Sequence, residues 1–136
     1  MRKGRKSILA LILFIIIAVT SYALYIWYKP ARNVAKEKGI QITAVAIFDS
    51  FSNNEQSANR HYLNKAIEVT GKVANVKKNQ AGQTVVYLQA SDPVFGVNCT
   101  FKQDPGTITK GNTITFKGIC TGYLSDVVIN EGILIK

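Results

Sequence analysis

Residues 65 to 78, KAIEVTGKVANVKK, are the stretch that decides the fold. The first half alternates polar residues with an apolar set that a pleated strand would carry on one face, namely Ile67, Val69, Gly71 and Val73. Val76 has the wrong parity to continue this series. We therefore predict one long strand with a bulge or bend near Ala74 and Asn75, able to pair with different neighbours at its two ends.

Four further stretches read as strands and are separated by turn residues. They cover residues 84–89, 95–101, 113–120 and 127–135, with a break allowed in the last at Glu131-Gly132. The turn signals between them include Gly82, Asp92-Pro93 and Asp104-Pro105-Gly106. Five short strands at regular spacing predict a small closed β-barrel.

An uncharged apolar run extends from Ile8 to Tyr28. As a helix it would be about 30 Å long, which matches the hydrocarbon core of a bilayer. Aromatic residues gather at its far end, as in an interfacial belt: Tyr22, Tyr25, Trp27 and Tyr28. Ser21 and Ala23 would suit signal-peptide cleavage, which is the alternative. We expect an uncleaved anchor because the run continues past them.

The anchor divides the chain into four parts. These are a basic cytoplasmic N-terminus (1–7), the transmembrane segment (8–28), a basic juxtamembrane linker (29–41) and a folded domain (42–136). Net charge is +9, but from Ile40 onward nine Lys and Arg oppose seven Asp and Glu, a net of +2. The basic residues before the apolar run favour a cytoplasmic N-terminus and an extracytoplasmic domain on the cytoplasmic (inner) membrane. The linker's lysines would be solvated or, alternatively, contact anionic headgroups.

An amphipathic helix is expected before the first strand. Thr43 can cap it, and its apolar residues recur at helical spacing: Ala44, Ile47, Phe48, Phe51, Ala58 and Tyr62. The polar interval from Ser52 to Glu55 leaves two shorter helices or a kink open. We expect the apolar face of this segment to cover one end of the barrel.

The two cysteines, Cys99 and Cys120, fall on predicted inward strand faces. They match no metal-ligand spacing, and we predict neither a metal site nor a cofactor. Two buried free thiols and a single disulfide between these residues are equal alternatives, the second requiring an oxidising compartment.

Three stretches carry a resemblance to a known family: residues 65–73 (KAIEVTGKV), 96–101 (GVNCTF) and 117–130 (KGICTGYLSDVVIN). Together they resemble the bacterial OB-fold family called tRNA_anti-like, over roughly residues 42–136. The resemblance implies a mainly β fold, a five-stranded OB-type barrel behind a membrane anchor or lipoprotein leader. It implies no catalytic residues, and the family name does not establish tRNA binding. Residues 102–110 are too short for the helix of a general OB fold, so the preceding helix would cap the barrel instead.

OB barrels usually present ligands to the outer surface of the second and third strands. Here that surface would carry Tyr87, Gln89, Asn98 and Thr100, which we predict to bind a ligand. Tyr123, between the last two strands, is a further candidate if its loop docks a partner; the alternative is that it packs over the barrel end.

We predict a binding protein without catalytic activity. His61 is the only histidine and lies in a polar helix end, and the eight carboxylates are scattered. The expected function is a membrane-anchored binding module in the bacterial envelope, with an envelope protein, peptide or glycan as ligand. The alternative is a single-stranded nucleic-acid or tRNA-binding module, which we do not favour because it needs several stacking rings and a basic track. A hydrolase would require His61 against a carboxylate and a cysteine in a cleft.

Overall fold

The computed structural model describes residues 2–136, which divide into two compact units, one ending at Arg32 and the other spanning Asn33–Lys136. The first unit contains helix α1 (Arg2–Tyr28). From Gly4 to Tyr28 this helix is long and apolar enough to cross a membrane, and its side chains are exposed within the described chain.

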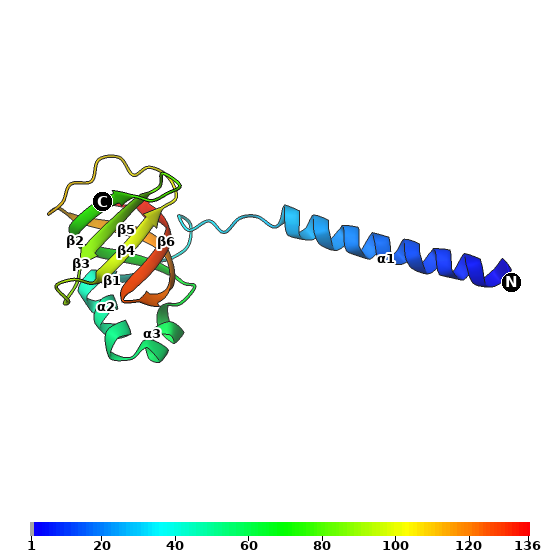
Figure 1. Cartoon of the computed structure of the whole chain (residues 1–136), viewed down its shortest axis with the longest axis horizontal. Coiled ribbons are helices and arrows are strands. Elements are labelled where there is room, and N and C mark those ends of the chain that lie inside the picture. The colour runs from blue at the N-terminus through cyan, green and yellow to red at the C-terminus, as the bar shows by residue number, and fades with distance from the viewer. Residues whose placement is uncertain (1) are drawn as a thin grey trace. The chain divides into compact units, whose positions relative to one another are not determined.

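The second unit is a closed five-stranded barrel with two short helices and one added strand (Figure 1). Strands β2 to β6 form the barrel, because β5 pairs with β6 on one side and returns to pair with β2 on the other. The fold class predicted from the sequence is therefore confirmed. The elements in chain order are β1 (Ile40–Thr43), α2 (Ala44–Asn53), α3 (Glu55–Tyr62), β2 (Ala66–Lys78), β3 (Thr84–Gln89), β4 (Gly96–Phe101), β5 (Thr113–Leu124) and β6 (Asp126–Leu134).

Strand β2 closes the barrel because it pairs with two different strands. Its first half, up to Lys72, pairs antiparallel with β5, and its second half, from Val73, pairs antiparallel with β3. The register with β3 shifts between Val73 and Asn75, which is the predicted bulge. A second irregularity lies in β6, where Glu131 has a φ of 54° and the register with β4 shifts. The bend in the long strand was thus readable from parity alone, and the break that the sequence allowed at Glu131-Gly132 is also present.

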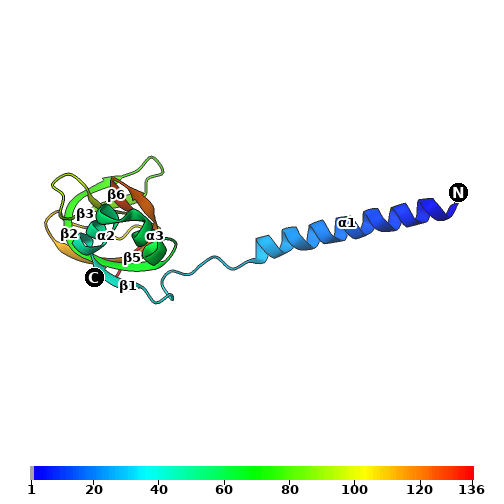
Figure 2. The same cartoon turned by 90° about the horizontal axis from the view of Figure 1, so that it is seen from below.

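The helices close one end of the barrel, as expected (Figure 2). The Thr43 hydroxyl accepts a hydrogen bond from the Ala46 amide and caps α2. Asn54 ends α2, and its side chain accepts from the Ser57 amide to begin α3, so the two-helix alternative is the observed one. The apolar side chains of α2 enter the core, where Ile47, Phe48 and Phe51 are buried.

The opposite end is closed by the loop from residue 102 to 112. Its Ile108 packs against the core, and its far end is fixed to β2 by two backbone hydrogen bonds of 2.8 Å, Val73 N to Asn112 O and Gly111 N to Val73 O. This loop connects β4 to β5, where a general OB fold has a helix, and residues 102–110 were predicted to be too short to form one.

Part of the segment predicted as a linker, residues 29–41, packs against the barrel. Strand β1 was missed: it pairs parallel with β2, with Ile40 opposite Ile67 and Thr43 opposite Thr70. Upstream, Val34 is buried against Ala66, Ile119 and Ile133 on the outer side of the barrel. Lys117 Nζ also donates to the Glu37 carbonyl at 3.0 Å. We call residues 33–39 the strap, since they lie against β2, β5 and β6.

Gly71 generates the first testable prediction, because a Cβ at this position would lie 2.8 Å from Ala44 Cβ and 3.0 Å from Leu88 Cδ1. Gly71→Val should therefore push α2 off the strand and lower the free energy of unfolding by roughly 1–3 kcal/mol through overpacking. Urea unfolding of residues 33–136, which retain both hydrophobic clusters, measures this. Lys72→Ala is the control at the adjacent exposed position, and equal stabilities of the two variants would contradict the close approach.

Candidate ligand-binding surface

The four strand residues predicted to bind a ligand lie together on the outside of β3 and β4. Tyr87 pairs with Asn98, Val85 pairs with Thr100, and Gln89 lies opposite Gly96. Gln89 is exposed, and Tyr87, Asn98 and Thr100 are half-buried, whereas their inward neighbours Val86, Leu88, Val97 and Cys99 are buried. The alternation of β3 and β4 therefore produces one outer face with a phenol, two amides and a hydroxyl, which we call the β3–β4 face.

One cation lies over the ring of this face. Lys77 Nζ is 5.7 Å from the centroid of the Tyr87 ring. A lysine in this position is attracted by the electron-rich face of the ring, by about 0.5–1 kcal/mol at an exposed site. The same lysine occupies one side of the ring on which a base would stack.

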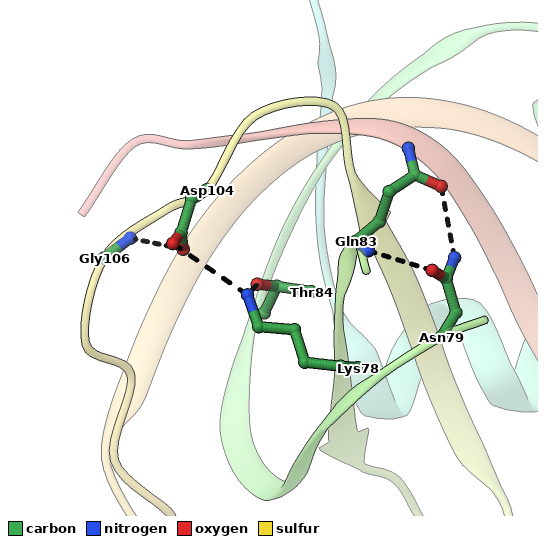
Figure 3. A network of polar contacts seen from close by, with 6 residues as sticks. All are labelled: Lys78, Asn79, Gln83, Thr84, Asp104 and Gly106. Carbon is green, nitrogen blue, oxygen red and sulfur yellow. Dashed lines mark hydrogen bonds and ion pairs between the residues drawn. The ribbon is translucent and has the colours of Figure 1, made fainter. Parts of the chain in front are cut away.

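Lys78, the last residue of β2, is held in a polar network (Figure 3). Lys78 Nζ donates to Thr84 Oγ1 at 2.7 Å and lies 3.9 Å from Asp104 Oδ2, and the Asp104 carboxylate also accepts from the Gly106 amide. On the neighbouring turn, Asn79 Oδ1 accepts from the Gln83 amide at 2.9 Å. The Lys78–Asp104 pair is exposed and contributes little stability. Lys78 pairs with Thr84, which has the inward parity of Val86, so this network lies at the barrel end beside the loop from residue 102 to 112 and not on the β3–β4 face.

Tyr123 does not join the β3–β4 face. Its ring stacks on Phe51 with centroids 5.7 Å apart and meets Phe48 edge-on at 6.1 Å. The side chain is half-buried and packs against the core beneath α2. The geometry is that of the covering alternative, in which Tyr123 helps to seal the barrel end.

A pocket that the sequence did not suggest lies between α3 and the β5–β6 hairpin. It is lined by Glu55, Asn59, Leu63, Thr121, Gly122, Tyr123, Leu124 and Val128. Its lining comes from two segments about sixty residues apart in the sequence, and no local motif connects them. Val128 is the one lining residue on a strand next to the β3–β4 face, since it pairs with Asn98 of β4.

The loop between β3 and β4 is held by two aspartates. The Asp92 carboxylate accepts from the amides of Val94 at 2.7 Å and Phe95 at 2.9 Å, and these hydrogen bonds, that of Phe95 foremost, lower the pKa of Asp92 below its ordinary value. Asp126 Oδ1 accepts from the Gly96 amide at 2.7 Å. The second bond joins the loop to the start of β6, so the β3–β4 loop and the β5–β6 turn lie side by side.

The cysteines are free thiols, and the disulfide alternative is wrong in this structure. Cys99 of β4 and Cys120 of β5 both lie opposite Ile129 of β6, which separates them. Two strand spacings amount to about 9.6 Å, well beyond the Cα separation that a disulfide spans. Burial raises the pKa of both thiols, and for Cys120 a hydrogen bond from the Gly122 backbone opposes part of that effect.

The thiols provide a second prediction. At pH 8 and without denaturant, iodoacetamide should modify Cys99 and Cys120 far more slowly than an exposed thiol, since burial disfavours the reactive thiolate. In urea without reductant both should react at once, giving two modified residues by mass spectrometry. A Ser91→Cys variant supplies the exposed reference. Recovery of an unmodified, disulfide-linked pair from the urea sample would contradict the separation by β6.

The groups considered for catalysis are not assembled into a catalytic arrangement. His61 is exposed on α3, with Nδ1 2.8 Å from the Ser57 carbonyl oxygen. Cys99 and Cys120 lie in the barrel core. Among residues 2–136, no group of three His, Cys, Asp or Glu could hold a metal ion.

The barrel order and the outer β3–β4 face define the class as an OB-fold protein with an apolar N-terminal helix. The chain belongs to the tRNA_anti-like family, whose model matches residues 1–131. The resemblance noted in the sequence is thereby confirmed. No curated protein matches the chain.

Two solved structures are similar to this chain. The "putative nucleic acid-binding lipoprotein" from Klebsiella pneumoniae subsp. pneumoniae is 15% identical, with a TM-score of 0.57 over 71% of this chain and 92% of its own. The yeast Stn1 and Ten1 structure is 12% identical, with a TM-score of 0.42 over 74% of this chain and 65% of its own. The first likeness shows the shared fold.

Proposed function

We propose that this protein is a membrane-anchored binding module whose OB barrel takes its ligand on the β3–β4 face and performs no chemistry on it. One observation carries the proposal. Tyr87, Gln89, Asn98 and Thr100 come from adjacent strands, project outward together and remain at least partly exposed. Neutral hydrogen-bonding groups beside a ring suit a polar ligand such as a polypeptide or glycan.

Other outer surfaces of the barrel are covered in part by the domain's own chain. The strap lies against β2, β5 and β6 through Val34 and the Lys117–Glu37 hydrogen bond. The helices cover one end, and the loop from residue 102 to 112 covers the other. The β3–β4 face, with Gln89 exposed and Tyr87, Asn98 and Thr100 half-buried, is a surface to which a ligand has access.

Nucleic acid is the second candidate ligand, and it has observations in its favour. Lys77 lies over Tyr87, and the similar lipoprotein from Klebsiella carries nucleic-acid binding in its name. Against it, the face has one ring, Tyr87, and one lysine, Lys77, lies over that ring. Stable binding of single strands needs successive stacking rings along a basic groove. We therefore favour a polypeptide or glycan.

An oligonucleotide titration separates the two candidates. With fluorescent dT20 and U20 at 50 to 300 mM NaCl, residues 33–136 should show no micromolar binding. The expected cause is the lack of further rings and of an uninterrupted basic track. Micromolar affinity that falls steeply with salt, and is lost in Tyr87→Ala but kept in the control Tyr62→Phe, would establish the nucleic-acid alternative.

The location of the binding face is testable in cells. A photoreactive benzoylphenylalanine replacing Asn98 should crosslink to a ligand in intact cells, because Asn98 lies in the middle of the face. The same residue replacing Lys72, exposed on β2, should give a weaker product or none. Gel shifts with mass spectrometry read out both. Equal crosslinking from the two positions would place the contact elsewhere.

We further propose that α1 is an uncleaved anchor and that the barrel lies outside the cytoplasmic membrane. The support is the length and apolar character of Gly4–Tyr28 and the basic residues at its N-terminal end. Protease added to intact spheroplasts should then digest the barrel while a cytoplasmic marker survives. A barrel that is degraded only after lysis would reverse the orientation.

A further inference from the structure

The pocket beside α3 lies in line with the β3–β4 face. Tyr87 pairs with Asn98, Asn98 pairs with Val128 of β6, and Val128 pairs with Gly122 of β5. These residues form one row across four neighbouring strands, three strand spacings or about 14 Å long. Val128 and Gly122 belong to the pocket lining, so the row runs from the Tyr87 ring into the pocket.

The pocket's apolar walls are unusually exposed for aliphatic side chains. Leu124 is 85% exposed and Leu63 is 36% exposed. On the adjoining β3–β4 loop, which Asp126 holds against the start of β6, Val94 is 77% exposed and Phe95 is 43% exposed. Exposed apolar side chains gathered at one end of a domain mark a surface that a partner covers.

The polar rim of the pocket determines the chemistry of that partner. The rim consists of the Asn59 amide, the Thr121 hydroxyl and the Glu55 carboxylate. Thr121 Oγ1 already donates to the Val128 carbonyl at 3.1 Å and accepts from Asn130 Nδ2 at 3.4 Å, so one lone pair remains to accept from a ligand. Glu55 is the one charged side chain that lines the pocket. A carboxylate here repels phosphate and attracts a cation.

We propose that this pocket is a subsite for a polypeptide ligand, which places one apolar side chain between Leu63, Leu124 and Val128 and a basic side chain near Glu55. The inference rests on the proposed function, because the rest of the peptide would lie along the row toward Tyr87. An extended chain advances about 3.3 Å per residue, so four or five residues cover the row. The ligand is an extended peptide segment with an aliphatic residue next to Lys or Arg at one end.

A displayed library of random heptapeptides, selected on the full-length protein in nanodiscs, provides the probe. Empty nanodiscs remove peptides that bind lipid. The selection should enrich peptides with an aliphatic residue adjacent to Lys or Arg. Affinities of the synthetic consensus peptide follow from fluorescence anisotropy with the wild type and three variants: Leu124→Ser, Glu55→Gln and Ile135→Ser.

Leu124→Ser should weaken the consensus peptide about tenfold, because the pocket loses its most exposed apolar wall. Glu55→Gln should weaken it several-fold and reduce the dependence of affinity on salt. Ile135→Ser is the matched control, an exposed aliphatic residue that does not line the pocket, and should bind as the wild type does. Circular dichroism checks that all three variants are folded, which the exposure of their side chains favours.

The outcomes distinguish the subsite from the broader proposal. Peptide binding that is lost in Tyr87→Ala but unchanged in Leu124→Ser and Glu55→Gln would overturn the subsite and leave the β3–β4 face as the binding surface. Failure to enrich any peptide would overturn the polypeptide ligand and with it the subsite, while crosslinking from Asn98 would still test the face. Enriched peptides that respond to both pocket variants support the inference.

Discussion

The structure depends on a single constraint, that β2 must pair with β5 in its first half and with β3 in its second. One straight strand cannot do both, because the two partners lie in different directions around the barrel. The bulge between Val73 and Asn75 supplies the change of direction. Gly71 stands just before it, without a side chain, and allows Ala44 of α2 to approach the strand closely. The close contact with α2 and the bend in β2 therefore lie within a few residues of each other.

Much of this arrangement could be predicted from the sequence because it is encoded locally. The alternation of apolar and polar residues predicted the barrel strands, and the parity change at Val76 predicted the position of the bulge within a residue or two. The cap at Thr43 was also readable. The pairings between distant segments could not be predicted from the sequence. Strand β1 is four residues long and pairs parallel with β2, so no hairpin turn in the sequence indicates the pairing. Val34 finds its partners only once β2, β5 and β6 are side by side.

The same distinction explains what was predictable at the candidate site. Tyr87, Asn98 and Thr100 were placed on one outer face by strand parity, and the observed register brings them together. Tyr123 was ambiguous, because its role depends on where α2 lies, and in the structure its ring is held by Phe51. The pocket needs α3 next to the β5–β6 hairpin, which is a tertiary contact without any local signal. The separation of the cysteines also required the register of β6 between their strands.

Closure of the barrel limits how such a domain can recognise anything. Strands β2 to β6 are paired around the ring, so a ligand cannot add itself to them as a further strand, and recognition by these strands depends on side chains and loops. The strap covers part of one outer surface and the two ends are covered, while the β3–β4 face and the adjoining hairpin stay at least partly exposed. On that surface, neutral hydrogen-bonding groups and exposed aliphatic side chains such as Leu124 predominate, with Lys77 over the Tyr87 ring and Glu55 at the pocket. A ligand that matches this surface combines apolar burial and hydrogen bonds with one basic group near Glu55, which is the chemistry of a polypeptide.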